Sequence, residues 1–476
     1  MKEVSKSIIK FANLIFVLGI LYFSTLLIYL IFKIYLTPEI ILQKTYLFIV
    51  LINIIFLLLF IFGLKFNNHL KVNLSLLFIV VGFTVCIFEI FLNYYQPKNM
   101  RAEQVAIKID KRTKIEVIQD LKNSGIDAYP NIHPGYLLKD SSTRNGLIIN
   151  NNESKIFPLG GISNKLMVQH NENGNWMKYV GDEHGFHNPK GLYNNQKLDI
   201  AIIGDSFAEG WSVNSDENIS AILRNLNYSV INFGKSGNGP LLEFATLKEY
   251  VKPLKPKIVL WLYFVNDFSD LNSELESSFL KKYFNEEFSQ NLMFRQDEID
   301  KTLLNFVNQD WNNLEKQKIT KERKIKLYDS LKNIIKIHNL RIKIKSFLTS
   351  KPNKDYSYFK NNPSEVRIIR GPVIEEDLLV FKNILKKSDS IINQWGGKLY
   401  FVYLPPYEIY KGYEPIYRKK ILQIVKENEI EIIDIHKEVF SIHEDPLSLF
   451  PFRLDGHYNA KGYNLIAETI STKIAY

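Results

Sequence analysis

The chain has 476 residues and a formal net charge of +10 at pH 7, with 60 Lys and Arg residues against 50 Asp and Glu residues. This length exceeds that of one typical domain and predicts about two to three units. The single cysteine, Cys86, excludes an intramolecular disulfide framework and a cysteine-based zinc site. The positive charge suits either a nucleic acid or a membrane surface, and the placement of the basic residues decides between these partners.

Three nearly uncharged apolar runs open the sequence, at residues 8–36, 46–64 and 72–94. A helix needs about 20 apolar residues to cross a bilayer. A signal peptide has one apolar region of about 7–15 residues before a small-residue cleavage site, unlike a long first run that is followed by two more. The runs therefore predict a permanent membrane anchor with three transmembrane helices over residues 1–96.

The basic residues that flank the anchor give conflicting signals about its orientation, because positive charges favour the cytoplasmic side. Lys2, Lys6 and Lys10 favour a cytoplasmic N-terminus, which three crossings would convert into an exported C-terminal part. A second basic group follows the third run and favours the opposite orientation: Lys98, Arg101, Lys108, Lys111, Arg112 and Lys114. Large domains translocate largely regardless of charge, so we expect a multi-pass membrane protein with an exported catalytic domain.

Residues 97–195 are polar and lack strong periodicity, and we interpret them as a linker and pre-catalytic segment. They contain “DEHGFHNP”, in which His184 and His187 have a spacing that would suit a metal site completed by Asp182 or Glu183. No helical pattern places these side chains on one face. We therefore expect them to serve loop packing or substrate contact, with no bound metal.

From Leu198 onward, short apolar runs alternate with amphipathic segments. The apolar runs are “DIAII”, “YSVINF”, “KIVLWLYF”, “GKLYFVYLPP” and “IEIIDI”. Runs of about 4–8 residues rich in Ile, Val and aromatic residues, separated by helical patterns, are typical of βαβ units and a parallel sheet. The pattern predicts an α/β domain over residues 196–476 that is built on a doubly wound, flavodoxin-like parallel sheet.

A charged and mostly helical stretch interrupts this alternation at about 269–386, and we interpret it as an insertion. Its basic centre runs from Lys316 to Lys354 and includes “SLKNIIKIHNLRIKIKSFL”. We expect a helix there that packs against its own domain through an apolar face. The alternatives are a helix that lies on anionic headgroups and a nucleic-acid site with strongly salt-dependent affinity; we expect no nucleic-acid partner.

Polar residues follow the predicted strands at their carboxyl ends, where reactive groups gather in a parallel sheet. Ser206 follows “DIAII”, the loop “GKSGNGP” with Gly237 follows “YSVINF”, and Asn266 follows “KIVLWLYF”. Beyond the last predicted strand, “RLDGHYNAKGY” carries Asp455 and His457. Singly, each of these residues is more often a helix cap or a turn residue. Together they supply a nucleophile, oxyanion donors, a base and a carboxylate.

These four segments, in this order, resemble the blocks of the SGNH (GDSL-like) hydrolase superfamily over about residues 195–476. The upstream stretches “FPLGGISN” and “DEHGFHNP” are similar to segments of membrane-anchored bacterial members. The resemblance implies Ser206 as the nucleophile, His457 as the general base and Asp455 as the carboxylate that orients the imidazole. It also implies an oxyanion hole formed by the N–H groups of Ser206 and Gly237 and the side-chain amide of Asn266, without any cofactor or metal ion.

The sequence departs from the family pattern at two positions. Phe264 stands where the family commonly has glycine, two residues before Asn266, and would narrow the cleft or alter the approach to this amide. Asp455 precedes His457 by two residues, where the family commonly has three. The shorter spacing makes Asp455 a less secure assignment than His457.

Other residues near the blocks compete for the same roles. Asp267 and Asp270 are substitutes for the orienting carboxylate, and we expect both to be structural. His436 and His443 compete with His457 as the base, but neither lies beside an Asp-Gly turn that leads into a helix. We expect both of these histidines to be ordinary surface residues.

The anchor and the resemblance together imply a membrane-bound, serine-dependent ester hydrolase or O-acyltransferase. We expect it to act on acyl esters, above all acetyl esters, of a cell-surface polysaccharide, with lipid esters as the alternative. Three helices are too few to carry acetyl groups across a membrane, so transfer would require a separate membrane acyltransferase as partner. The competing hypothesis is a non-catalytic scaffold or glycan-binding protein, against which the intact Ser206, Asn266 and His457 argue.

Overall fold

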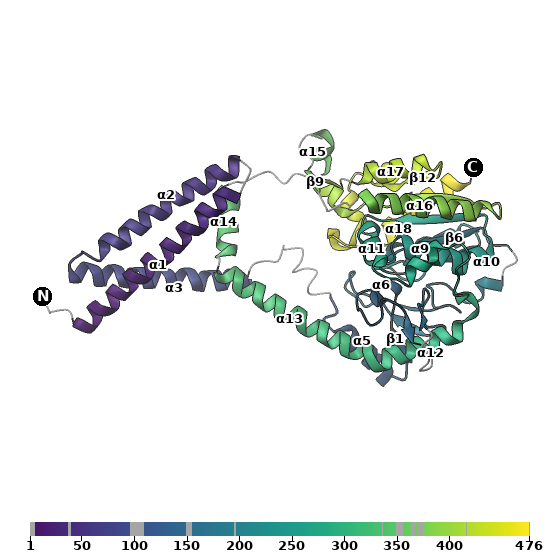
Figure 1. The fold of residues 1–476 in the computed structure, drawn as a ribbon, viewed down its shortest axis with the longest axis horizontal. Helices are drawn as coiled ribbons and strands as arrows, with labels where there is room; N and C mark the ends of the chain where they lie inside the picture. Colours follow the sequence, from purple (N-terminus) through teal and green to yellow (C-terminus); the bar gives the residue numbers. More distant parts are fainter. Residues whose placement is uncertain are drawn as a thin grey trace. The chain divides into compact units, whose positions relative to one another are not determined.

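The chain divides into two compact units in the computed structural model, which describes residues 5–36, 40–95, 109–148, 155–194, 197–335, 337–348, 356–362, 367–369, 375–415 and 417–475. The first unit comprises residues 1–96 and 322–350, and the second comprises residues 97–321 and 351–476. Figure 1 labels the helices and strands of both units. The expected Lys98, Arg101 and Lys108 flank of the anchor lies outside the described residues.

Three helices match the three apolar runs at the start of the chain: α1 (Lys6–Leu36), α2 (Ile40–Gly63) and α3 (Asn68–Tyr95). Two stretches, Lys6–Tyr35 and Asn68–Leu92, are long and apolar enough to cross a membrane, and Leu47–Gly63 forms a shorter apolar helix among the described residues. Most of their large apolar side chains are exposed. Such exposure is unfavourable in water and suits a lipid environment.

Glycine allows α1 and α2 to pack closely. A methyl group on Gly19 of α1 would collide with the Phe60 ring of α2, and one on Gly63 would collide with Phe16. The rings of Phe16 and Phe60 lie 5.5 Å apart. Small residues that let apolar helices approach are typical of helix pairs in membranes.

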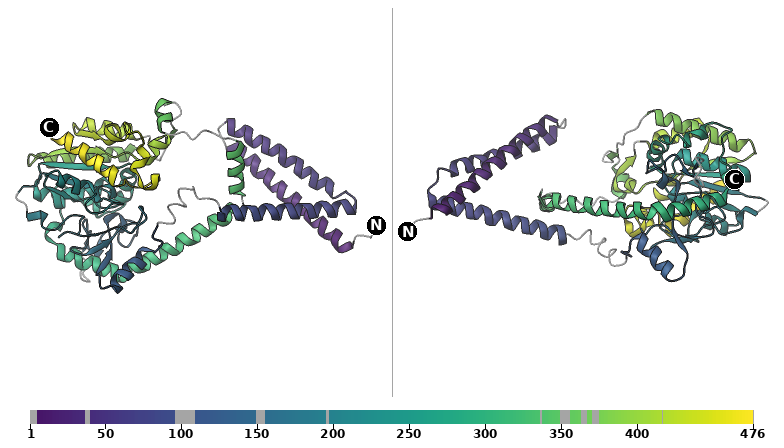
Figure 2. Two further views of the ribbon diagram at one scale, coloured as in Figure 1. Left: turned by 180° about the vertical axis from the view of Figure 1, so that it is seen from behind. Right: turned by 60° about the horizontal axis from the view of Figure 1, so that its bottom comes forward.

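The basic stretch forms α13 (Asn312–Ile335) and α14 (His338–Leu348). Figure 2 shows α13 as one continuous helix. Residues 322–350 group with the N-terminal helices, and α14 contacts α3. The sequence predicts that this basic segment packs against the α/β domain, whereas α14 packs against α3 of the first unit.

A parallel sheet of 5 strands forms the centre of the second unit, in the order β12-β10-β8-β6-β7. The strands are β6 (Ile200–Gly204), β7 (Val230–Asn232), β8 (Ile258–Tyr263), β10 (Lys398–Tyr403) and β12 (Glu431–Asp434). All residues of β6 and β7 are buried. This burial explains why these strands appear in the sequence as continuous apolar runs.

Successive residues of the interior strand β6 belong to two different hydrophobic clusters. Ala201 and Ile203 join one cluster, and Ile200 and Ile202 join the other. Because side chains alternate along a strand, the two clusters lie on opposite faces of the sheet. The helices α9 (Pro240–Thr246), α16 (Glu375–Asn393) and α17 (Arg418–Glu427) contribute to the first cluster, and α8 (Ile219–Asn225) and α18 (Ala460–Ile474) to the second.

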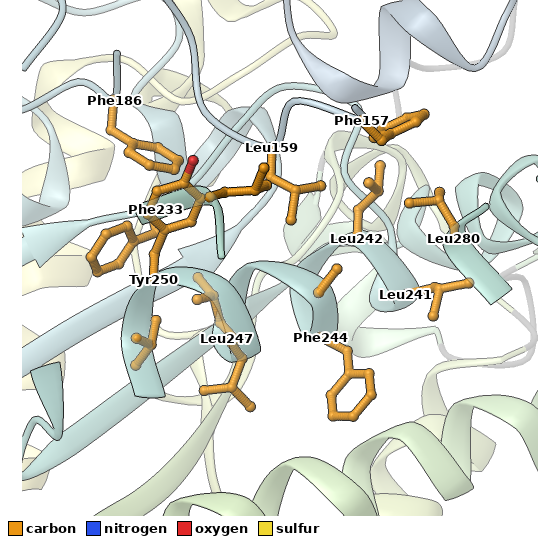
Figure 3. Packing of buried hydrophobic residues seen from close by; sticks show 14 of the residues in the cluster. Phe157, Leu159, Phe186, Phe233, Leu241, Leu242, Phe244, Leu247, Tyr250 and Leu280 are labelled. Carbon is orange, nitrogen blue, oxygen red and sulfur yellow. The ribbon is translucent and has the colours of Figure 1, made fainter. Parts of the chain in front are cut away.

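The segment that precedes the serine block is folded. It forms α5 (Lys114–Asn123), β1 (Ala128–Pro130), α6 (Pro134–Leu137), β2 (Leu147–Ile148), β3 (Lys155–Ile156), β4 (Leu166–Val168) and β5 (Lys178–Val180). Strands β1, β4 and β5 form a small sheet in which β4 and β5 are antiparallel. Phe157, Leu159 and Phe186 pack in the core beside Leu242 and Tyr250, as Figure 3 shows. Much of the expected linker is therefore part of the second unit.

The predicted helical stretch between β8 and β10 is divided between the two units. Its first part includes α11 (Asp267–Leu275), η3 (Leu280–Phe284), η4 (Leu292–Phe294), α12 (Gln296–Phe306) and η5 (Val307–Trp311). Buried Ile299 and Leu303 of α12 belong to the hydrophobic core of the second unit. Beyond α14, the described elements before α16 are α15 (Tyr356–Asn361) and β9 (Arg367–Ile369), which pairs with β11 (Tyr413–Pro415).

Candidate active site

Ser206 lies at the carboxyl end of β6, as the first residue of the short helix α7 (Ser206–Glu209). Asp205 caps this helix, because its side chain accepts a hydrogen bond of 2.9 Å from the N–H of Phe207. Gly204 precedes Asp205. A Cβ atom at Gly204 would lie 2.8 Å from both Ala208 Cβ and the Leu262 carbonyl oxygen. The absence of a side chain at Gly204 allows the sharp turn that presents Ser206 at the strand end.

A continuous chain of hydrogen bonds joins Ser206, His457 and Glu172. The Ser206 Oγ lies 2.7 Å from Nε2 of His457, and Nδ1 of His457 lies 2.7 Å from Oε2 of Glu172. The same carboxylate oxygen accepts the N–H of His457 at 3.1 Å and the hydroxyl of Ser212 at 2.7 Å. This is the arrangement of a nucleophile, a base and a carboxylate that orients the base.

The electrostatics of the site keep Glu172 ionised. Burial alone would raise the pKa of Glu172, but hydrogen bonds from His457 and Ser212, together with the charge of His457, outweigh it and lower the pKa to about 2. An ionised carboxylate only accepts hydrogen bonds, so the proton between Glu172 and His457 resides on Nδ1. Nε2 is then left as the acceptor for the Ser206 hydroxyl.

The lowered pKa of Glu172 makes the stability of the fold depend on pH. A carboxyl whose pKa falls from 4.5 to about 2 on folding stabilises the fold fully above pH 4.5, and this contribution is lost as the pH falls toward 2. We expect the melting temperature of the wild type to fall more steeply over this window than that of Glu172→Gln. Thermal unfolding between about pH 2 and 5 measures the difference, and parallel curves would contradict it.

The structure corrects the assignment of the orienting carboxylate. Asp455 is exposed, and no hydrogen bond joins it to His457 among the described residues. Glu172 occupies that position from the loop between β4 and β5, and Oε2 of Glu172 would lie 3.2 Å from a Cβ on Gly456. The loop backbone at Gly456 therefore passes so close to Glu172 that the preceding Asp455 is turned to solvent.

Glu172 is the functional residue that the sequence analysis missed. It stands in “QHNENGNW”, a polar stretch between two short apolar runs, and this pattern predicts only a turn. Its partner His457 is 285 positions away in the chain. No spacing rule links residues so far apart, and only the hairpin of β4 and β5 brings the carboxylate to the site.

The glycine loop lies against the helix that carries Ser206. A side chain at Gly234 would collide with Ala208 and with the backbone of Glu209, and Gly237 adopts a φ of +67°. The Ser236 N–H donates to Glu209 at 3.0 Å. The N–H groups of Ser206 and Gly237 donate to no other group among the described residues, which leaves both available to an oxyanion.

Asn266, the third expected oxyanion donor, lies beside the serine turn. Its Nδ2 donates to Asp270 at 2.9 Å. Burial and the charge of Asp205 raise the pKa of Asp270 to about 7. Asp267 is buried and accepts the N–H of Phe264 at 2.9 Å. Neither aspartate bonds to His457 within the described part of the chain.

Aromatic rings enclose His457. The ring of Phe207 lies 4.4 Å from that of His457, and Trp211 lies 5.1 Å from it. Phe264, at the position where the family commonly has glycine, stacks on Phe207 at 4.0 Å. The side chain at Phe264 thus supports the ring that packs against the base.

A buried ion pair connects α7, the glycine loop and the upstream segment. Lys235 and Glu209 have fully buried side chains, 3.2 Å apart between Nζ and Oε1. Nζ of Lys235 also donates to Asn131 at 3.1 Å and to the Tyr179 hydroxyl at 2.9 Å. The second oxygen of Glu209 accepts the indole N–H of Trp211 at 2.9 Å. These contacts hold α7, which begins at Ser206, against the glycine loop and the upstream segment.

The histidines and acids of “DEHGFHNP” are engaged in internal hydrogen bonds. Asp182 accepts the N–H groups of His184 and Phe186 and the side-chain amide of Asn188. His187 contacts the Glu209 carbonyl and the Ser215 hydroxyl, each at 2.8 Å. Among the described residues, no group of His, Cys, Asp and Glu has the geometry to hold a metal ion.

The two competing histidines lie away from the Ser206 hydrogen-bond chain. His436 is half-buried and its Nδ1 lies 2.9 Å from the Tyr410 hydroxyl. Burial, together with the charge of Arg418, lowers the pKa of His436 to about 4. His443 accepts the N–H of Asp445 at 3.0 Å. These contacts are local and place neither histidine on Ser206.

Comparison with known proteins finds no matching family model and no matching curated protein. Among solved structures, the chain is similar to a putative lipolytic protein of the G-D-S-L family from Desulfitobacterium hafniense, at 13% identity and a TM-score of 0.30, over 58% of this chain and 99% of that chain. It is similar to a putative acylhydrolase from Bacteroides fragilis, at 12% identity and a TM-score of 0.29, over 59% and 89% of the two chains. A catalytic mutant of an acetylxylan esterase from Geobacillus stearothermophilus matches at 12% identity and a TM-score of 0.29, over 59% and 94%.

Proposed function

We propose that the protein is a serine-dependent ester hydrolase or O-acyltransferase that works through an acyl-enzyme on Ser206. The observation that carries the proposal is the hydrogen-bonded chain from Ser206 through His457 to the ionised Glu172. A serine hydroxyl is a weak nucleophile until a neighbouring base removes its proton. In this arrangement His457 is the base, and Glu172 fixes its tautomer.

The reaction follows from the placement of these groups. Ser206 Oγ attacks the acyl carbonyl carbon while its proton moves to Nε2 of His457, and Glu172 stabilises the imidazolium through Nδ1. The N–H groups of Ser206 and Gly237 and the amide of Asn266 stabilise the oxyanion. His457 then returns the proton to the departing alcohol. Water, or a sugar hydroxyl, then attacks the acyl group while giving up a proton to His457. As the bond to Ser206 breaks, His457 returns this proton to Ser206 Oγ.

We propose acetyl esters of a cell-surface polysaccharide as the substrate, with lipid esters as the alternative. The apolar N-terminal helices support a membrane anchor, for which we propose three crossings and an exported catalytic domain. Transfer to a sugar would require a separate membrane acyltransferase that delivers the acyl group. We propose a doubly wound, flavodoxin-like fold for the α/β domain at 196–476, with an insertion at about 269–386; the strand order supports the flavodoxin-like arrangement.

Covalent labelling of the full chain in detergent tests this function. We expect the wild type to hydrolyse p-nitrophenyl acetate and to react with a fluorophosphonate probe, and Ser206→Ala to do neither. His457→Ala should lose activity to a similar extent, because the two residues act as a unit. Ser273→Ala, at an exposed serine of α11, is the matched control and should keep both properties.

The competing scaffold hypothesis predicts a different result. A wild-type chain that neither hydrolyses the ester nor reacts with the probe would favour a non-catalytic, glycan-binding role. Equal labelling of the wild type and Ser206→Ala would show that the reactive group is another residue.

A further inference from the structure

The helix α14 is attached to the apolar N-terminal unit through a buried acid. Glu89 of α3 is fully buried, and its carboxylate accepts the N–H groups of Asn339 and Leu340, each at 2.8 Å. These N–H groups belong to the first turn of α14, where helix donors lack partners within the helix. Glu89 therefore acts as a cap that fixes the start of α14 to α3.

The position of Glu89 in α3 sets the depth of this attachment. Glu89 lies in the last turn of the apolar stretch Asn68–Leu92, and each helical residue advances by about 1.5 Å. A carboxylate at that level of an apolar helix needs a partner, because an unpaired charge in hydrocarbon is costly. The start of α14 thus lies at the end of the apolar stretch, at the level where a membrane-spanning helix would meet the lipid headgroups.

The surface of α14 combines charge with exposed apolar side chains. Ile342 and Ile344 are 47% and 50% exposed, and Arg341 between Leu340 and Ile342 is exposed as well. The end of α13 continues this character with exposed Leu331 and Lys332. Large apolar side chains beside basic ones are typical of helices that lie in a membrane interface.

The sequence around α14 carries a strong excess of positive charge. Between residues 322 and 350 the basic residues are Arg323, Lys324, Lys326, Lys332, Lys336, Arg341, Lys343 and Lys345, and the acidic residues are Glu322 and Asp329. Clusters of this kind next to a membrane helix attract anionic headgroups. Because α14 contacts α3, these basic residues lie beside the membrane that α3 is proposed to cross.

We propose that α14 is an interfacial helix that docks on anionic lipid headgroups next to α3. The inference rests on the proposed membrane anchor and is independent of the catalytic mechanism. Ile342 and Ile344 would enter the boundary of the acyl chains, while Arg341 would reach the headgroups.

Collision measurements on a nitroxide label test this docking in the full chain. The label is attached to Ile342→Cys after the native thiol is removed by Cys86→Ala, and the protein is placed in phosphatidylcholine vesicles with or without phosphatidylglycerol. With the anionic lipid, we expect the label to be shielded from a water-soluble nickel complex and open to dissolved oxygen. Replacing Arg341 and Lys332 by glutamine should reduce this shielding.

Two reference labels separate the inference from the anchor on which it rests. Leu76→Cys, at an exposed residue of α3, should report the bilayer core, and Lys461→Cys, at an exposed residue of α18, should report water. One outcome would overturn the docking and leave the anchor intact. In this outcome the nickel complex reaches the label at Ile342→Cys as readily as the label at Lys461→Cys in both kinds of vesicle, while the label at Leu76→Cys is shielded. Equal shielding with and without anionic lipid would also overturn it. Exposure of Leu76→Cys would refute the anchor, and fluorophosphonate labelling of each variant tests the catalytic proposal separately.

Discussion

Replacing Glu172 by glutamine is expected to reduce kcat/KM for p-nitrophenyl acetate by about 10⁴-fold, because a neutral amide no longer selects the tautomer of His457 that accepts the Ser206 proton. Glutamine keeps the size of the side chain, so the loss reports the charge and the acceptor at Nδ1. In the structure that acceptor lies 2.7 Å from the ring nitrogen. Steady-state kinetics of the purified full chain measure the effect.

Asp455→Asn is the matched control for this prediction. Asp455 is exposed and belongs to the same sequence block as His457, so a small change in activity is expected. A large loss of activity in Asp455→Asn and a small loss in Glu172→Gln would instead identify Asp455 as the carboxylate that orients His457. Circular dichroism of both variants shows whether either loss comes from unfolding.

Replacing Lys235 by methionine is expected to destabilise the catalytic unit by about 3–5 kcal/mol, because it leaves the Glu209 carboxylate buried without its charged partner. Both side chains are fully buried, and Glu209 also binds Trp211 and the N–H of Ser236. Chemical denaturation of the full chain in detergent, followed by tryptophan fluorescence, measures the change. Lys235→Met should also be less active than the wild type at temperatures at which both remain folded, because the geometry of the glycine loop is partly lost.

An exposed ion pair supplies the control for this second prediction. Lys398 and Glu431 pair on the edge of the sheet with side chains that are 52% and 59% exposed, and such pairs contribute little. Lys398→Met should therefore unfold like the wild type. The double variant Lys235→Met with Glu209→Gln should recover part of the loss, since no buried charge remains. Equal stability of Lys235→Met and Lys398→Met would show that the buried pair is unimportant.

The sequence predicts those parts of the site that lie at strand ends of the central sheet. Ser206 ends a buried apolar run, and His457 precedes a well-patterned closing helix, so the α/β rule alone draws attention to both. The structure joins them with a hydrogen bond of 2.7 Å. Parallel strands that are buried on both faces have a strong apolar signature, which is why the sheet is also visible in the sequence.

The parts that the sequence does not predict depend on contacts between distant segments. Glu172 lies in a loop of short strands, and elements of 2 or 3 residues leave no measurable periodicity. Phe157 and Phe186 lie in a stretch without strong periodicity, yet both pack in the hydrophobic core, Phe157 beside Leu242 and Phe186 beside Tyr250 (Figure 3). The contact of α14 with α3 likewise depends on Glu89, a single acid within an apolar stretch.

The hydrogen bonds of Glu209 and Glu172 determine how much of the chain the site needs. The Glu209 carboxylate binds Asn131 and Tyr179 from the segment before the serine block, and Glu172 comes from the same segment. A chain without this segment would lack both the acceptor for Nδ1 of His457 and two hydrogen-bond partners of Glu209. If Ser206 acts as we propose, a fragment that begins at the serine block would therefore fold without the carboxylate that orients His457, and we expect it to be inactive.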